Sequence, residues 1–550
     1  MPAIAIDEEP NEAARQIIDA EILKLRLRIA ELSSTRNSLA PISRLPAELL
    51  TIIWIYARDA SPLYSKSKMA MTISWVSVDW RRTSQDWSGL WSHIDIDHYK
   101  GVRAFLAHSR QVPLVLTLHF ERSMDYAIFQ HLHRVRYVDL SCGVDNSDAR
   151  KCVSLNSRWS AQSPMLDTLS LTRTNLPPVL FTHPPPLHSL HLKECSFKSL
   201  PLLAGLTSLI ISSPTRLIAV TDFLKTLQRL PNLVTLSLDH VFSRIHSPFT
   251  PAAVELSKLQ ALNIAELHQN PVPYLFQNIS IPGNTETNLL VSPASRDFNL
   301  PGLLASYCAC RISPAPIHTL EVSISLLSSQ IKSSSEIKIL EQGPNSSTRT
   351  TISIGDAAFG FNPFSQSSTS LNLSSLQRLD LTLTGGRAHR FRLMGINEDD
   401  WNTFYGSLQR LRIVKATGPA AHIFLDLLAK QGSKAWGSYK ELLPPVLQPA
   451  PVPEGLNQSD SAADPPESSA PNPRAPLSWN ALRELILVFP TDDPPFMREQ
   501  VNEVHLFVDL LIRKEIGIGL TSMRYSDWPN SARLLQALEG VVGEVLEQEP

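Results

Sequence analysis

The sequence contains little cysteine, little glycine and no strong excess of charge. Of its 550 residues, five are cysteine and 21 are glycine, and the formal net charge at pH 7 is −2. An odd, scattered set of cysteines is not typical of a disulfide framework. A nearly neutral chain produces no long-range field that favours nucleic acid or an anionic membrane. We therefore expect free thiols, no nucleic-acid partner and a place in the reducing cytoplasm or nucleus.

Targeting and membrane-spanning segments are also missing from the sequence. Residues 1–10 are acidic and carry no apolar stretch, so they predict a disordered end and no signal peptide. A membrane helix needs a run of about 18 or more apolar residues, and the sequence contains none. We expect no membrane span and no membrane partner.

Signatures of common catalytic sites do not occur either. The chain lacks the glycine-rich loops that bind phosphates or dinucleotides, the His-Glu-x-x-His zinc motif and the Gly-x-Ser-x-Gly nucleophile elbow. Cys308 and Cys310 have no second pair at the spacing of a zinc site. The sequence thus predicts no catalytic residue, no cofactor and no metal. An enzyme would need a polar cleft with perturbed titrating groups, assembled from distant positions.

Aromatic residues concentrate in residues 42–97, where five of the ten tryptophans lie. Pro46 suits the first turn of a helix, where its missing N–H costs nothing, and Glu48 suits the positive end of the helix dipole. A second helix is expected over residues 73–82, after a loop rich in serine and lysine. In the first helix, apolar residues recur at three-to-four spacing and predict an apolar face made of Leu49, Ile52, Ile53 and Tyr56.

This stretch resembles the F-box, in the form common in basidiomycete fungal proteins. The family pattern has a Leu-Pro-x-Glu helix start, a Trp-Arg pair in a later helix and a closing Leu-Trp-x-x-Ile. The cysteine that usually precedes the Trp-Arg pair is missing, and Ser77 and Val78 stand in its place. The matching residues are Leu45-Pro46, Glu48-Leu49-Leu50, Ile53-Trp54, Trp80-Arg81, Leu90-Trp91 and Ile94.

The resemblance implies a small all-α domain that docks on a Skp-type adaptor, which in turn joins a cullin–RING scaffold for ubiquitin transfer. The residues it assigns to the docking face or to its supporting core are Leu45, Pro46, Leu49, Leu50, Ile53, Trp54, Trp80 and Trp91. The sequence alone does not separate these two roles. The alternative is a small three-helix domain with some other partner.

Residues 11–41 predict a charged helix with a seven-residue apolar repeat. Its apolar positions step by four and three residues through Ile18, Ile22, Leu25, Ile29 and Leu32. So short a repeat is marginal as an isolated coiled coil. Two interpretations stay open. Residues 17–39 pair with a second copy in a homodimer, or the helix folds back on, or leads into, the next domain.

A Leu-x-x-Leu-x-Leu pattern recurs after the F-box-like stretch. Copies begin at residues 135, 166, 187, 206, 233, 259, 317, 376, 408 and 482, and those from 166 to 259 lie 19 to 27 residues apart. This spacing resembles that of leucine-rich repeats, whose short strands stack because no unit can bury its apolar face alone. The alternative is an α/β domain with leucine-rich parallel strands. In a solenoid the target protein would lie on the strand face, with Thr168, His188, Thr207 and Thr235 as candidate contact residues.

The predicted fold class is α plus α/β: an N-terminal helix, an F-box-like domain and an irregular leucine-rich-repeat solenoid. The solenoid is expected at residues 98–327, 376–442 and 479–550, the last segment ending in a C-terminal helix. Two polar insertions, Ser-rich at 328–375 and Pro/Ser-rich at 443–478, are expected to be disordered because they bury too little apolar surface. Helices between strands are predicted at Asp222–Leu230, Ala420–Leu428, Glu503–Ile512 and Ser531–Leu546.

Together these features favour a substrate-receptor subunit of a cullin–RING ubiquitin ligase. In that reading, the F-box binds the Skp-type adaptor and the repeats bind an unidentified target protein. The alternative is a leucine-rich-repeat scaffold that binds proteins without any part in ubiquitin transfer.

Overall fold

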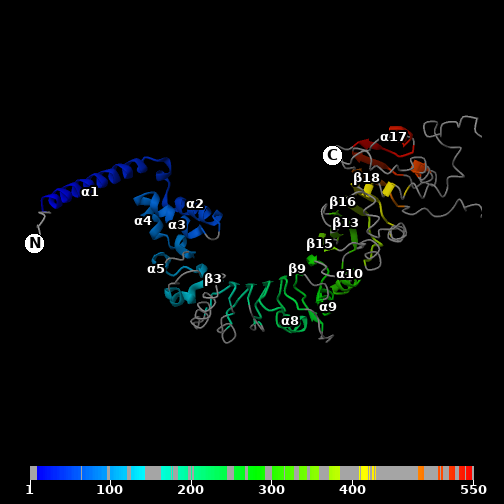
Figure 1. Ribbon diagram of the computed structural model, residues 1–550, viewed down its shortest axis with the longest axis horizontal. Coiled ribbons are helices and arrows are strands. Elements are labelled where there is room, and N and C mark those ends of the chain that lie inside the picture. The colour runs from blue at the N-terminus through cyan, green and yellow to red at the C-terminus, as the bar shows by residue number, and fades with distance from the viewer. Residues whose placement is uncertain are drawn as a thin grey trace, which may run out of the picture. The chain divides into compact units, whose positions relative to one another are not determined.

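The computed structural model describes residues 9–62, 65–95, 99–120, 126–142, 163–174, 184–195, 203–243, 253–266, 271–291, 300–314, 316–326, 333–342, 347–357, 371–384, 410–418, 481–488, 520–526, 532–538 and 541–547, with isolated positions between some of these ranges. The chain divides into two compact units. Unit 1 is Met1–Leu206 with Pro214–Arg216, and unit 2 is Thr207–Ser213 with Leu217–Pro550. Both combine helices with mostly parallel strands (Figure 1). The insertion predicted at 443–478 lies outside the described residues.

Unit 1 begins with helices. Pro46 directly precedes α2, where its fixed φ and missing N–H suit a helix start. The single helix predicted over residues 73–82 is wrong. Ser77 ends α3 and caps α4, its side-chain oxygen accepting a hydrogen bond from the N–H of Trp80 at 3.1 Å. The elements are α1 (Glu9–Ser38), η1 (Pro41–Arg44), α2 (Ala47–Ala60), α3 (Lys66–Val76), α4 (Val78–Asp86), η3 (Ser88–Ser92), α5 (Tyr99–His108) and η4 (Tyr126–Arg134).

The strands of unit 1 pair in parallel and in chain order. They are β1 (His93–Ile94), β2 (Leu114–Phe120), β3 (Val135–Cys142), β4 (Thr168–Thr172) and β5 (Ser189–Lys193). Their inward residues stack in columns, because each strand covers the apolar face of the next. One buried column consists of Ile94, Leu116, Val138, Leu169 and Leu190. Strand β1 thus joins the helical segment to the sheet.

Unit 2 starts with a repeating strand–helix arrangement. Helix α9 contacts both other helices, and alternate strand residues are buried and half-exposed, so the helices cover one face of the strands (Figure 1). The parallel strands are β6 (Ser208–Ser212), β7 (Thr235–Asp239), β9 (Ala261–Glu266) and β11 (Glu286–Val291). The helices are α8 (Val220–Leu227), α9 (Pro271–Gln277) and α10 (Leu300–Ala309). A second, short parallel sheet holds β8 (Val254–Glu255), β10 (Ile279–Pro282) and β12 (Arg311–Ile312).

The Ser-rich segment 328–375 differs from the disordered insertion that its composition predicts. It contains β14 (Ser333–Gln342) and β15 (Ser347–Ala357), which form an antiparallel meander with β13 (Ile317–Leu326). Strand β15 pairs in parallel with β11, and β13 pairs in parallel with β16 (Arg378–Thr384). The meander is therefore built into the sheet. The loop prediction is wrong because buried Ile337, Ile339 and Ile352 alternate with polar residues and complete the core.

The parallel sheet continues after β16. A helix predicted to run to Leu546 is wrong, because α17 ends at Leu538 and β20 pairs with β19. The helices predicted at Ala420–Leu428 and Glu503–Ile512 each contain buried helical residues. In the first they are Ala420, Phe424 and Leu425, and in the second Leu506, Phe507 and Leu510. The last elements are β17 (Ile413–Thr417), β18 (Glu484–Val488), β19 (Ser522–Ser526), α17 (Ala532–Leu538) and β20 (Val545–Glu547).

One repeat lies in a different register from the one its sequence predicts. In β17 the buried residues are Val414 and Ala416, whereas Ile413 is half-exposed. The copy predicted to begin at Leu408 therefore begins three residues later, at Leu411. Leu408 instead precedes the repeat, and its carbonyl accepts a hydrogen bond from the N–H of Leu411 at 3.3 Å. The buried leucine at position 408 is therefore an additional apolar residue ahead of the copy that starts at Leu411.

Cysteine chemistry departs from expectation at one position. Cys195, Cys308 and Cys310 are free thiols, and burial raises the pKa of Cys195 to about 11. Cys142, at the end of β3, is disulfide-bonded, so the expectation of free thiols is wrong for this residue.

As for membrane segments, none of the helices within the described ranges combines the length and apolarity of a span.

A buried ion pair ties the meander to the second sheet of unit 2. Arg311 in β12 donates hydrogen bonds to the carboxylate of Glu341 in β14, with 2.5 Å between Nη2 and Oε2, and to the carbonyl of Gly283. Both side chains are almost fully buried, and the guanidinium carbon lies 5.3 Å from the centroid of the Tyr307 ring. Loss of one partner would leave a buried charge without its counter-ion.

We expect Arg311→Met to lower the free energy of unfolding by about 3–5 kcal/mol, because Glu341 then keeps an uncompensated buried charge. The double variant Arg311→Met with Glu341→Leu should recover most of that loss. Denaturant unfolding followed by circular dichroism measures both variants against the wild type. An equal loss in the single and double variants would contradict the importance given to the ion pair.

A second buried carboxyl lies at the end of β9. Glu266 accepts hydrogen bonds from the backbone N–H groups of Val241 and Phe242, at 2.6 and 3.1 Å. Burial raises the pKa of Glu266 to about 7, against the opposing effect of these hydrogen bonds and of nearby His240. The folded chain therefore binds this proton more tightly than the unfolded chain does.

Stability should consequently fall as pH rises from about 4.5 to about 7. A raised folded-state pKa stabilises most below the unfolded pKa, and the contribution, at most about 3 kcal/mol, is lost above the folded pKa. Glu266→Gln keeps a hydrogen-bond acceptor but removes the ionisation, so it should lack this loss. Urea unfolding of both chains at about pH 5 and about pH 8 makes the comparison. An identical pH dependence in the two chains would refute the prediction.

Candidate functional site

Helix α2 has two apolar faces, and only one of them is buried. Leu50, Trp54 and Arg58, spaced by four residues, face the interior of unit 1. The opposite face carries four large apolar side chains in contact with solvent. Leu49, Ile52, Ile53 and Tyr56 are 48%, 47%, 43% and 73% exposed. We call these four residues the α2 outer face.

Tryptophans build the core beneath this face. The buried Trp54 ring lies 5.1 Å from the ring of Trp80, centroid to centroid. Trp91 is also buried, and its Nε1 donates a hydrogen bond to the carbonyl of Ser84 at 2.6 Å. The Trp91 ring packs edge-on against Phe105 of α5 at 4.9 Å. These contacts join α2, α4, η3 and α5 into one rigid support.

Arg58 fixes the far end of α2. Its guanidinium donates a hydrogen bond to the carbonyl of Gly89 in η3 at 2.6 Å and forms an ion pair with Asp59 at 2.9 Å. Burial acts to raise the pKa of Asp59, but the hydrogen bond and charge of Arg58 lower it. Burial, with Arg58 and Lys66, lowers the pKa of the neighbouring His93 to about 4. His93 is therefore neutral at physiological pH, and the support should not change its charge there.

The acidic residue after β1 has a structural partner. Both carboxylate oxygens of Asp95 accept hydrogen bonds from the backbone N–H of Ser67, at 3.1 and 3.2 Å. Ser67 lies in the first turn of α3, where unpaired N–H groups favour a carboxylate. Asp95 thus anchors the start of α3 to the sheet.

The structure separates the eight residues that the sequence places in the docking region. Pro46, Leu49 and Ile53 are exposed, whereas Leu50, Trp54 and Trp91 belong to the core. Leu45 and Trp80 are half-buried, so each has one part in the core and another at the surface. Ile52 and Tyr56 complete the outer face, and their three-to-four spacing with Leu49 is the sequence signal for them. A further exposed apolar group, at the junction of α3 and α4, consists of Trp75, Val76 and Val78.

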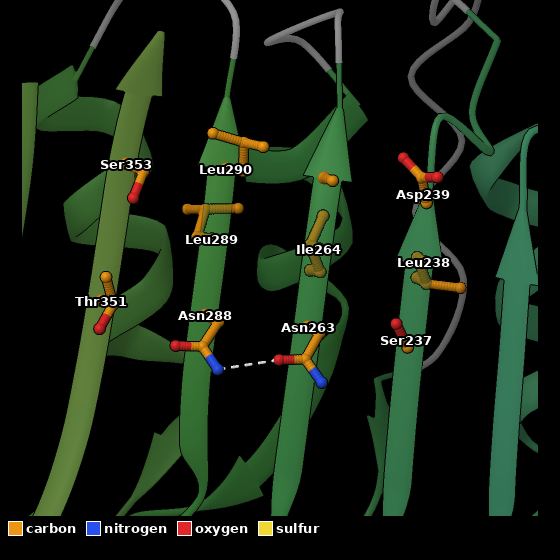
Figure 2. A pocket seen from close by; sticks show the side chains of 11 residues that line it. Ser237, Leu238, Asp239, Asn263, Ile264, Asn288, Leu289, Leu290, Thr351 and Ser353 are labelled. Atoms are coloured by element: carbon orange, nitrogen blue, oxygen red, sulfur yellow. Dashed lines mark hydrogen bonds between the residues drawn. The ribbon is translucent and has the colours of Figure 1, made fainter. Parts of the chain in front are cut away.

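A second candidate surface lies on the outward strand face of unit 2, at a hollow of about 270 Å³. Figure 2 shows the side chains that line it. Equivalent positions on neighbouring strands form a row of uncharged hydrogen-bonding side chains. The row consists of Ser237, Asn263, Asn288 and Thr351. Asn288 Nδ2 donates a hydrogen bond to Asn263 Oδ1 at 2.9 Å. Leu290 adds an exposed apolar side chain from β11. This surface can offer hydrogen bonds and apolar contact to a protein ligand.

The four predicted target-contact residues lie near the starts of strands in their units. Thr168 and Thr235 are the first residues of β4 and β7, and both are half-buried. His188 Nδ1 lies 2.7 Å from Asp167 Oδ1, so its imidazole is already engaged. The carbonyl of Thr207 accepts hydrogen bonds from the N–H groups of residues 234 and 235. The hollow in unit 2 lies at later strand positions. Ser237 and Asn263 stand between the last two apolar residues of their copies of the leucine pattern, whereas Asn288 and Thr351 belong to no copy.

Over the part of the chain that the structure describes, no cluster of three or more His, Cys, Asp or Glu side chains could hold a metal ion. The chain matches no model of a known protein family and no curated protein.

The division of α2 into an inner and an outer face can be tested on adjacent residues. Trp54→Ala should lower the free energy of unfolding by about 3–5 kcal/mol, because it empties the core under α2. Ile53→Ala removes an exposed side chain and should change stability by about 0.5 kcal/mol or less. Thermal and urea unfolding of the full chain measure both. Comparable losses in the two variants would show that the outer face is covered.

Proposed function

We propose that this chain is the substrate-receptor subunit of a cullin–RING ubiquitin ligase. In this proposal residues 42–97 are an F-box domain that docks on a Skp-type adaptor. The remaining strands form an irregular leucine-rich-repeat solenoid that binds the target protein. Such a subunit contributes no catalytic residue and acts in the cytoplasm or nucleus. The observation that carries the proposal is the α2 outer face, four large apolar side chains exposed on one helix.

Exposed apolar residues scattered singly are ordinary, but a contiguous row on one helix face is typical of a docking surface. Residues at positions i, i+3, i+4 and i+7 are the anchors that a helix presents to a groove on a partner protein. Tyr56 adds an aromatic side chain of the type enriched at interface hot spots. Trp54, Trp80 and Trp91 hold the helix rigidly from below, which lowers the entropy cost of binding.

The strand region supports the second half of the proposal. Inward positions repeat leucine and similar residues, while outward positions vary from strand to strand and expose polar side chains. Variable side chains on a regular frame suit recognition of a particular protein. The hollow around Asn263 and Asn288 gives this part of the face a concave shape that suits such a contact.

A repeat scaffold without ubiquitin chemistry is the second candidate function. It would use the same strand face for its ligand, and the segment 42–97 would serve only to cap the strands. The observation that favours this possibility is strand β1, which joins that segment to the sheet of unit 1. Adaptor binding separates the two candidates.

The test is titration of the full chain with a purified Skp-type adaptor. We expect each chain to bind one adaptor. The double variant Leu49→Glu with Ile53→Glu should lose affinity about 100-fold or more, since charges then face an apolar groove. Leu217→Glu is the matched control, because Leu217 is 49% exposed but belongs to unit 2. Its affinity should equal that of the wild type. No binding by folded wild-type chain, or full binding by the double variant, would reject the proposed docking surface.

A further inference from the structure

Helix α1 carries a long apolar seam. The seam residues recur every three or four positions, lie on one side of this 30-residue helix and are all exposed. They are Ile18, Ile22, Leu25, Ile29 and Leu32. At the C-terminal end of the helix, Asn37 donates a hydrogen bond to the carbonyl of Val76 at 3.4 Å. The seam itself faces solvent, and an apolar row of this length is typical of a helix that pairs with another.

The residues in the seam favour a pair of helices. Isoleucine occupies one set of seam positions, at residues 22 and 29. Leucine occupies most of the other set, at residues 25 and 32, where Ile18 is the exception. In parallel coiled coils this distribution favours two strands over three or four, and we take only the number of helices from it. We propose that α1 pairs with α1 of a second copy of this chain in an antiparallel two-stranded coiled coil centred between Leu23 and Lys24.

Charges beside the seam select a second copy of the same helix as the partner. In the antiparallel pair, Ile22 packs opposite Leu25 of the second copy. Asp19 then faces Arg26 of the second copy, and Glu21 faces its Arg28. Two-fold symmetry repeats each contact, so four pairs of opposite charge flank the seam and like charges do not meet there.

Two other charges, which lie in the seam itself, disfavour a parallel pair. Arg15 and Arg36 occupy seam positions, so a parallel pair would place each of them directly against its own copy in the seam. Like charges in such positions repel at short range and lose water on pairing. In the antiparallel pair, Arg15 lies opposite Leu32 of the second copy. Its aliphatic stem can pack there while the guanidinium reaches solvent.

Two matched variants of the full chain test the seam. Leu25→Ser with Leu32→Ser removes seam residues that are 55% and 56% exposed. Leu23→Ser with Leu27→Ser removes leucines on the other side of the helix that are 58% and 59% exposed. Light scattering across the micromolar range should find dimers for the wild type and the second variant, and monomers for the first. A monomeric wild type, or dimers lost equally in both variants, would overturn the proposal. Dimers lost only with Leu23 and Leu27 would place the interface elsewhere and overturn it too.

Charge variants test the orientation. Asp19→Lys sets a lysine against Arg26 of the second copy only in the antiparallel pair, where it should weaken the dimer about tenfold. In a parallel pair, position 19 faces Ala14, and the dimer would be unaffected. The double variant Asp19→Arg with Arg26→Asp restores opposite charges in the antiparallel pair and should recover the wild-type affinity. In a parallel pair it sets a new carboxylate at position 26 against Glu21. A double variant weaker than Asp19→Lys would therefore reject the antiparallel arrangement.

This dimer is independent of the adaptor. Both sets of variants are measured on the chain alone, so loss of adaptor binding would leave the result unchanged. With adaptor present, an intact dimer predicts a complex of two chains with two adaptors.

Discussion

Burial of Trp54 decides which of the two apolar faces of α2 stays in solvent. The indole is the largest side chain on the helix, and it packs against Trp80 while Arg58, one turn further on, bonds to the carbonyl of Gly89. These contacts bury the inner face, so that the opposite face points to solvent. That face carries Leu49, Ile52, Ile53 and Tyr56. Because the support includes α4, η3 and α5, the outer face should keep its shape whether or not a partner is present. The proposed docking surface is thus a by-product of core packing, and its apolar character would be a liability in a chain that never used it.

Parallel stacking is the second constraint. Each strand contributes inward residues to a shared core, while the chain between strands is free to vary in length and content. Unit 2 uses this freedom by building the β13–β15 meander into the sheet, secured by the Arg311–Glu341 ion pair. Outward positions carry no such packing constraint, which is why one row can hold Ser237, Asn263, Asn288 and Thr351 together. In the proposed receptor, stability and target choice would therefore lie on opposite faces of the same strands.

Much of this arrangement can be predicted from the sequence where apolar spacing is regular, as at Leu169 and Leu236 in β4 and β7. Prediction fails where another residue takes a core position. The leucine pattern does not predict strand β11, because a threonine, the buried Thr287, takes the inward position that leucine holds in other strands. The pattern does not predict the meander, because serines surround the alternating Ile337 and Ile339. It predicts the wrong register at Leu408, because an extra leucine precedes the strand there. The break at Ser77 depends on a hydroxyl cap that periodicity does not register. For α2, both faces are apolar in sequence, and only the packing of Trp54 tells docking residues from core residues.

The central claim, that the α2 outer face binds a protein partner, is tested most directly by hydrogen–deuterium exchange of the full chain with and without a Skp-type adaptor. The account predicts slower exchange in the complex over Ala47–Ala60 and the adjoining α3–α4 junction, with the strands of unit 2 unchanged, because docking stabilises the helices that it covers. A stable complex in which α2 exchanges as fast as in the free chain, with protection confined to other segments, would contradict it.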